Sequence, residues 1–136
     1  TKVGIHLCYG DLNNRAFLRV ESVQPLVLFA NALFRRWPDS QKLEFVHYPL
    51  AMGDEAPRQD RDFYQPFKKL RQPKDVRFIA GFVHEKLDYV ESTAILDTLE
   101  GLVPHEVGVA SSCGLGRRTK KQAETLFEQT KELTQV

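Results

Sequence analysis

The sequence has almost no net charge and lacks long hydrophobic runs. It contains 19 Lys and Arg against 18 Asp and Glu, a formal charge of +1. A near-zero charge provides no electrostatic attraction for nucleic acid or an anionic membrane. No apolar run approaches the roughly 20 residues of a spanning helix, and the amino end lacks a signal-peptide pattern. We therefore expect a soluble, cytoplasmic protein that binds neither nucleic acid nor membrane.

Cysteine is also scarce, since Cys8 and Cys113 are the only two in 136 residues. In a secreted chain two cysteines would suggest a disulfide. Without a secretory signal, reduced thiols are the prediction. The length and the 42% hydrophobic content predict one ordered domain spanning residues 1–136, or part of a larger one.

The two cysteines belong to similar stretches, residues 3–11 and 107–118. Each is an apolar run that reaches a cysteine and stops at glycine, which is typical of a buried parallel strand. His6 and Cys8 are two residues apart and face the same side of a strand. Because zinc prefers nitrogen and sulfur ligands, His6, Cys8 and Cys113 predict a catalytic zinc site. The alternative is that the cysteines only fill the core.

Strand and helix patterns alternate along the chain. Strands are predicted at residues 3–8, 43–48, 76–83 and 106–112, and helices at 22–37, 62–70, 91–102 and 119–133. Four consecutive βα units favour an α/β fold with a parallel sheet and right-handed crossovers. A complete (β/α)8 barrel needs about 250 residues, so the chain is long enough for about half of one.

Helical spacing also predicts which side chains face the core. Phe29 is expected to be buried in the first long helix and Phe127 in the last. The predicted polar site residues lie at or just past strand ends, where barrel enzymes build active sites. They are His6, Cys8, His47, His84 and Cys113. His105, in a loop, is assigned only a structural role.

The motif His6-Leu7-Cys8-Tyr9 and the later Ser112-Cys113-Gly114-Leu115, followed by a basic pair, carry a family resemblance. The chain resembles the carboxyl-terminal part of cobalamin-independent methionine synthase, within the superfamily that also includes uroporphyrinogen decarboxylase. In that family the two motifs supply zinc ligands that bind the homocysteine thiolate. The resemblance implies the last four strands of a barrel, a small-molecule thiol substrate, and a partner that is either the missing amino-terminal half-barrel or another subunit.

The resemblance also assigns further site residues. His47 falls where the family has a zinc-binding glutamate and becomes the fourth metal ligand, although imidazole carries no negative charge. His84 falls at a histidine that passes a proton to the departing pterin. Asp11 either orients His6 or caps the next segment. Arg117 and Arg118 either hold a substrate carboxylate or form a solvated basic pair.

Three functions follow as hypotheses. The first is zinc-dependent thiol methyl transfer, in which the metal keeps the thiol ionised. The second is a related barrel enzyme with another reaction, because a fold and part of a site do not fix the substrate. The third is a half-barrel without catalysis of its own, whose open strand edges pair with another polypeptide.

Overall fold

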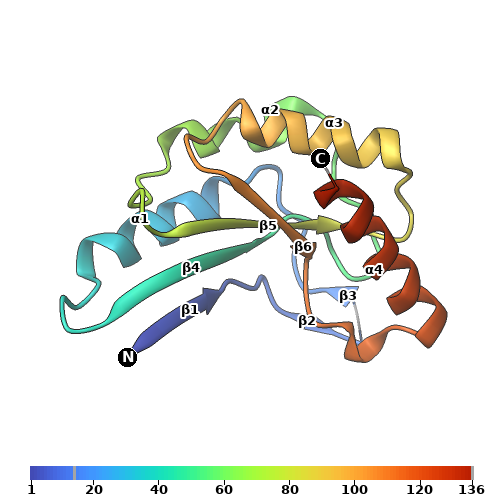
Figure 1. Ribbon diagram of the computed structural model, residues 1–136, viewed down its shortest axis with the longest axis horizontal. Coiled ribbons are helices and arrows are strands. Elements are labelled where there is room, and N and C mark those ends of the chain that lie inside the picture. The colour runs from blue at the N-terminus through green and yellow to red at the C-terminus, as the bar shows by residue number, and fades with distance from the viewer. Residues whose placement is uncertain (14, 136) are drawn as a thin grey trace.

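The computed structural model describes residues 1–13 and 15–135 and contains a four-stranded parallel sheet. The strands are β1 (Lys2–His6), β4 (Lys42–Pro49), β5 (Arg77–Val83) and β6 (Val107–Ser111), and they lie side by side in sequence order (Figure 1). The four predicted strands are confirmed with end shifts of one or two residues. Because β1 ends at His6, Cys8 lies in the loop beyond it.

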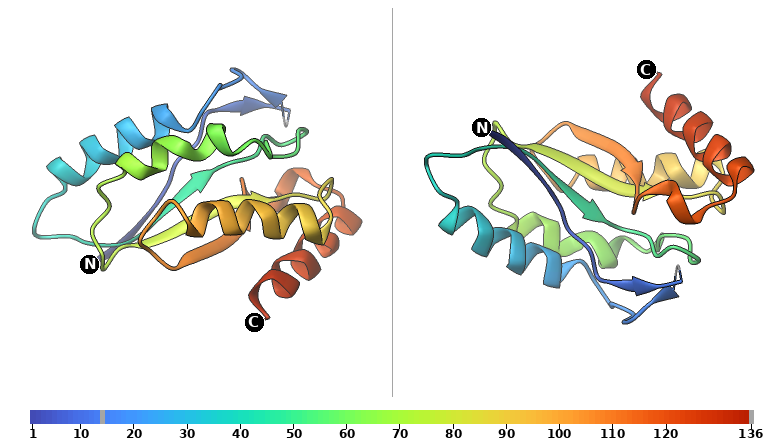
Figure 2. Two further views of the ribbon diagram at one scale, coloured as in Figure 1. Left: turned by 90° about the horizontal axis from the view of Figure 1, so that it is seen from above. Right: turned by 90° about the horizontal axis from the view of Figure 1, so that it is seen from below.

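The helices follow the strands in the predicted order. They are α1 (Gln24–Arg36), the short α2 (Arg61–Tyr64) with the 3-10 turn η1 (Gln65–Lys69), α3 (Tyr89–Glu100), the 3-10 turn η2 (Leu115–Arg117) and α4 (Lys120–Thr134). Seen from below, the strands lie in front of α1 and α3, and α4 stands beside the sheet (Figure 2). None of the helices in the described ranges is long and apolar enough to cross a membrane.

The right-handedness of strand-helix-strand connections explains why the connecting helices lie on one face of the sheet. Right-handed crossovers between strands that are added in one direction place each helix on the same face of the sheet. The other face, which we call the open face, carries Gly4 and His6 of β1 and Phe45 and His47 of β4, which are exposed or half-buried. The fold is therefore an α/β sheet compatible with half of a barrel.

A small hairpin interrupts the first connection, where the sequence predicts only an irregular polar stretch. Its strands are β2 (Asp11–Leu12) and β3 (Arg15–Ala16), which pair antiparallel. Gly10, with φ of 81°, precedes the hairpin in a backbone conformation that glycine adopts without steric cost.

The core lies between the sheet and the helices. Tyr48 stacks on Phe78 at 4.7 Å between ring centroids, and Phe67 of η1 meets Tyr48 and Phe78 edge-on at 5.4 and 5.2 Å. Aromatic pairs prefer such geometries. The buried Tyr48 hydroxyl donates to Gln72 at 2.7 Å, and the Gln72 amide donates to the Val76 carbonyl at 2.9 Å. The polar groups inside this cluster therefore satisfy each other.

Two aromatic residues predicted to be buried are exposed. Phe29 is 58% exposed and Phe127 66% exposed, whereas Val27 and Leu126, two residues or one away, are 3% and 2% exposed. In α1 apolar residues surround most of the helix, so spacing alone leaves the buried side ambiguous, whereas in α4 Phe127 lies at the margin of a narrow apolar stripe. Packing then selects the face that fits closest to the sheet.

Both long carboxyl-terminal helices begin at capping boxes. Asp88 accepts from the Glu91 backbone amide while Glu91 accepts from that of Asp88, and Thr119 and Gln122 do the same for α4. These reciprocal bonds satisfy amides that have no partner within the helix. They explain why α3 begins at Tyr89, two residues before the predicted start.

Replacing Leu99 by Ala should measure how strongly α3 is held on the sheet. Leu99 is fully buried, so the change should lower the free energy of unfolding by about 2–5 kcal/mol. Val90→Ala on the same helix, at a position 74% exposed, should change it by about 0.5 kcal/mol or less. Urea unfolding followed by circular dichroism gives both values. Equal effects of the two variants would contradict the described burial of α3.

Candidate functional site

The predicted site residues all lie at the carboxyl edge of the sheet. His6 is the last residue of β1, His47 is near the end of β4, and His84 directly follows β5. Cys8 and Cys113 each lie two residues beyond a strand. Parallel strands bring these positions to the same edge, as expected from the sequence.

The two thiols meet although their strands are the outer two of the sheet. Cys8 and Cys113 both line a cavity of about 40 Å³, together with Gly10, Asp11 and Gly53. Both cysteines are free and exposed, and the Gly10 amide donates to the Cys8 sulfur at 3.2 Å. The loops after β1 and β6 therefore approach each other beside the loop that follows β4.

An ion pair joins the same two loops. Arg117 donates through Nη1 to the Asp11 carboxylate. Asp11 raises the pKa of Arg117, and the negative charges of Cys113 and Cys8 raise it further. The ion pair thus ties the loop after β1 to the turn that follows β6. Asp11 binds Arg117 in this arrangement, and within the described residues it forms no hydrogen bond or ion pair with His6.

His6 and His47 form a direct imidazole pair on the open face. Their Nδ1 atoms are 2.7 Å apart, and the Nε2 atom of His47 lies 2.9 Å from the Ser111 carbonyl. Since a carbonyl only accepts, the hydrogen-bond partners assign a proton to Nε2 of His47. Nδ1 of neutral His47 then accepts from Nδ1 of His6. Nε2 of His6 keeps a free lone pair, while both nitrogens of His47 are occupied.

Burial keeps His47 neutral. Removal from water is the largest cause that lowers the pKa of His47, the Ser111 hydrogen bond opposes it, and the charge of His6 lowers the pKa further. The neutral form is the one that both donates to Ser111 and accepts from His6. The pair therefore has a defined direction of hydrogen bonding.

Gly81 provides the space for this pair. A Cβ atom on Gly81 would come within 2.7 Å of His47 Nε2 and 2.8 Å of the Tyr48 carbonyl oxygen. The imidazole lies across β5 at this point and reaches from β1 to the end of β6. Only glycine leaves room for that crossing.

His84 and Arg118 form a second, buried cluster. His84 is fully buried; its Nε2 lies 3.3 Å from the Gly53 carbonyl, and its Nδ1 accepts from the Lys86 amide at 3.1 Å. Arg118, whose side chain is 6% exposed, donates to the same Gly53 carbonyl at 3.1 Å and to Glu85 at 3.3 Å. The cluster ties the loop after β4 to the end of β5 and the start of α4.

The arrangement does not contain a preformed metal centre. In residues 1–13 and 15–135 no group of three His, Cys, Asp or Glu side chains is placed to hold one ion. The donor types at this edge of the sheet nevertheless suit zinc, since the two thiols of the cavity and the free Nε2 of His6 at the end of β1 are sulfur and nitrogen ligands. Zinc binding would require these side chains to move together.

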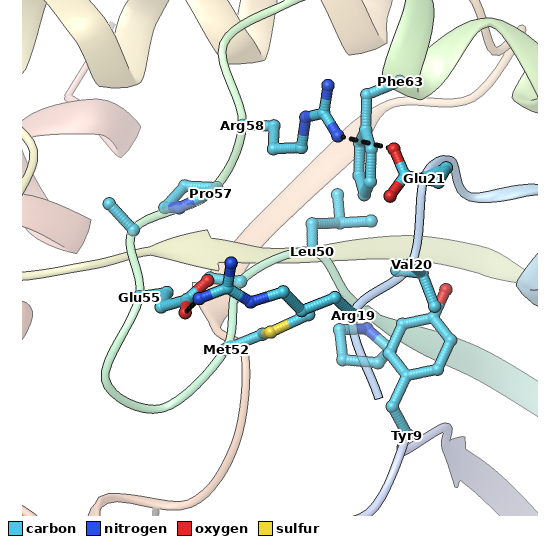
Figure 3. A pocket seen from close by; sticks show the side chains of 13 residues that line it. Tyr9, Arg19, Val20, Glu21, Leu50, Met52, Glu55, Pro57, Arg58 and Phe63 are labelled. Atoms are coloured by element: carbon cyan, nitrogen blue, oxygen red, sulfur yellow. Dashed lines mark hydrogen bonds and ion pairs between the residues drawn. The ribbon is translucent and has the colours of Figure 1, made fainter. Parts of the chain in front are cut away.

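A larger cavity beside the thiol site was not predicted. It has a volume of about 240 Å³ and shares Tyr9, Pro49, Ala51 and Met52 with the thiol cavity (Figure 3). Its other walls come from residues 19–21 and 55–58 and from Phe63. The one available signal was the long loop after the second strand, a usual place for binding residues.

Gly81→Ala tests the imidazole crossing. The added methyl group should displace His47 and lower the free energy of unfolding by about 1–3 kcal/mol. Gly116→Ala is the control, because no atom lies within 4 Å of its added Cβ. Urea unfolding gives the free energy of unfolding, and the NMR chemical shifts of the imidazole nitrogens report the environment of His47. An unshifted His47 spectrum in Gly81→Ala would refute the crossing.

Acid should destabilise the fold through His84. Burial is the largest cause that lowers the pKa of His84 below its ordinary 6.5, and the charge of Glu85 opposes it. The unfolded chain therefore takes up the proton first, and the stability present at neutral pH is lost as the pH falls below about 6.5. His84→Gln should flatten the decline between pH 7 and 5, whereas His105→Gln should retain it. An identical slope in all three proteins, by urea unfolding, would contradict this.

Comparison with known proteins gives no relative from which to assign this site. The chain matches no protein-family model, no curated protein and no solved structure.

Proposed function

We propose that the chain is the carboxyl-terminal half of a (β/α)8 barrel and acts as a zinc-dependent methyltransferase-like protein on a thiol. One observation carries the proposal. Cys8 and Cys113, which are 105 positions apart and follow the two outer strands, line one cavity together with Asp11, which binds the Arg117 guanidinium. Such a pair of thiols at the carboxyl edge of a parallel sheet suits a metal-bound thiolate.

In this proposal His6, Cys8 and Cys113 hold the zinc. His6 has the free Nε2 atom for the metal, because its Nδ1 atom donates to His47. The sequence predicts His47 as the fourth ligand, but both of its nitrogens are engaged, so we assign it the positioning of His6. Metal-binding histidines usually carry such a partner on the other nitrogen. Bound zinc would lower the pKa of a substrate thiol and hold it as thiolate.

The remaining predicted residues receive distinct roles. Arg117, half exposed and bound to Asp11 of the thiol cavity, is the candidate for a substrate carboxylate. Arg118 and Asp11 position loops through their contacts with Gly53 and Arg117. His84 remains the candidate proton donor, although it is fully buried and must lose its bond to the Gly53 carbonyl to act.

The proposal includes a partner that completes the barrel. Helices cover one face of the sheet, while β1 and β6 are free edges within the described chain and the open face carries half-buried side chains. Uncovered edges and an uncovered face favour association. The partner is the other half-barrel or a second subunit, in a reducing compartment such as the cytoplasm, where thiols persist.

A related enzyme with another reaction is the second candidate, and His47 favours it. A neutral imidazole at the family's glutamate position leaves the metal less negatively charged and a stronger Lewis acid. A thiolate held by such a metal is a poorer nucleophile. We therefore expect little methionine formation from homocysteine and methylated folate, even in the assembled protein.

Zinc analysis of purified variants tests the ligand set. The wild-type protein should retain about one zinc per chain, and Cys8→Ser and Cys113→Ser should each lose it. His47→Gln should keep the ion with about 10–100-fold lower affinity, because it removes only the partner of a ligand. His105→Gln, which alters the histidine outside the site, is the control.

Metal content by mass spectrometry and competition with a chelating dye give the occupancies and affinities. Full zinc occupancy in both cysteine variants would refute the site. Complete loss in His47→Gln would instead make His47 a ligand.

A further inference from the structure

The 240 Å³ cavity lies between the first two strand-to-helix connections. Residues 9 and 19–21 come from the connection after β1, and residues 49–52 and 55–58 come from the end of β4 and its loop. Leu50 and Phe63, 3% and 6% exposed, form apolar wall, and Met52 adds a flexible thioether. Cavities with apolar walls at this edge of a parallel sheet are usual ligand sites.

Two ion pairs flank the cavity, and the arginine comes from the first connection in one pair and from the second connection in the other. Arg19 of the first connection binds Glu55 of the second at 2.5 Å. Glu21 of the first connection binds Arg58 of the second at 3.5 Å. Figure 3 shows Leu50 between the two pairs. Each pair therefore joins the same two segments, one on either side of the space.

These pairs leave no charge free to select an ion. Arg58 is bound by Asp60 at 2.7 Å as well as by Glu21, and Arg19 is bound by Glu55. A carboxylate ligand would have to displace a protein carboxylate, and a cationic ligand would have to displace a guanidinium. The rim charges thus favour an uncharged ligand.

One polar group in the wall is unsatisfied. The Tyr9 hydroxyl is shielded from solvent and has no hydrogen-bond partner among the described residues. A phenolic hydroxyl carries its proton near neutral pH and can donate it in a hydrogen bond. A buried donor without a partner is destabilising, and a ligand oxygen that reached it would remove that cost. The Arg19 and Glu21 side chains at the rim are 80% and 92% exposed, so little packing holds them in place.

We propose that this cavity binds an uncharged, mainly apolar molecule of about one ring that carries one hydrogen-bond-accepting oxygen, and that Tyr9 donates to this oxygen. An apolar cavity of about 150 Å³ holds benzene, so 240 Å³ leaves room for a ring and a short substituent. Entry parts the two surface ion pairs, which are weak. The site is independent of zinc, although it shares a wall with the thiol cavity.

Met52 provides the measurement, because it is the only methionine in the chain. A chain labelled with ¹³C at the methionine methyl group gives one NMR signal from the cavity wall. Acetophenone, which has one ring and one carbonyl oxygen, should shift this signal in a saturable manner. Ethylbenzene, which lacks the oxygen, should bind about five- to tenfold more weakly, and benzoate and benzylamine should cause no saturable shift.

Three variants locate the ligand. Tyr9→Phe should lower the affinity for acetophenone by about five- to tenfold and leave the affinity for ethylbenzene unchanged. Tyr89→Phe, on the surface, should change neither affinity. Ala56→Leu should fill the cavity and abolish the shift, whereas Ala94→Leu on the exposed side of α3 should not. Circular dichroism confirms that each variant is folded.

Equal acetophenone affinity in wild type and Tyr9→Phe would overturn the proposal. So would tighter binding of benzoate, or a saturable shift that survives in folded Ala56→Leu. Absence of any saturable shift in the wild-type protein would show that the cavity holds solvent only, and would also overturn it. None of these outcomes depends on zinc, so failure here is distinct from failure of the proposed function.

Discussion

The handedness of the crossover connections is the constraint on which the structure depends. Four parallel strands added in one direction must place their helices on one face and their outgoing loops at one edge. The first consequence is a core of aromatic and aliphatic side chains under the helices. The second is that residues 100 or more positions apart in the chain, such as Asp11 and Arg117, come into contact. The candidate site therefore results from topology rather than from any local motif.

Polar contacts between loops then determine the shape of that edge. The Gly53 carbonyl accepts from Arg118 and lies beside Nε2 of His84, so one backbone oxygen links the ends of β4, β5 and the start of α4. Arg118 is nearly buried and paired with Glu85. Loss of one partner would leave a charge without compensation in the interior, which makes this cluster costly to break. The exposed ion pairs around the larger cavity are weak by comparison. The edge thus combines a fixed part near the thiols with a part that can open.

Much of this could be predicted from the sequence, because hydrophobic periodicity and glycine or proline boundaries act locally. The strands, the helix order and the placement of site residues at strand ends follow from such signals. The exposure of Phe127 does not, since it depends on which helix face fits the sheet. The crossing of His47 over Gly81 does not either, because it requires the register that pairs Pro49 with Gly81. The role of Tyr9 cannot be predicted from the sequence for the same reason. Its hydroxyl is shielded from solvent and unpartnered only because loops from two connections enclose it.

His47 connects these observations to the chemistry. Its two nitrogens bridge β1 and β6, and this bridge holds His6 with one free nitrogen at the edge of the sheet. A glutamate at this position could bind a metal directly, but it could not donate to the Ser111 carbonyl. In the function we propose, the negatively charged ligand of the family that the sequence resembles would be replaced here by a neutral group that joins strands. Under that proposal the chain would orient an imidazole and gather two thiols without the charge that makes a metal-bound thiolate strongly nucleophilic. The position of one imidazole thus bears on both the assembly of the edge and the reaction it can support.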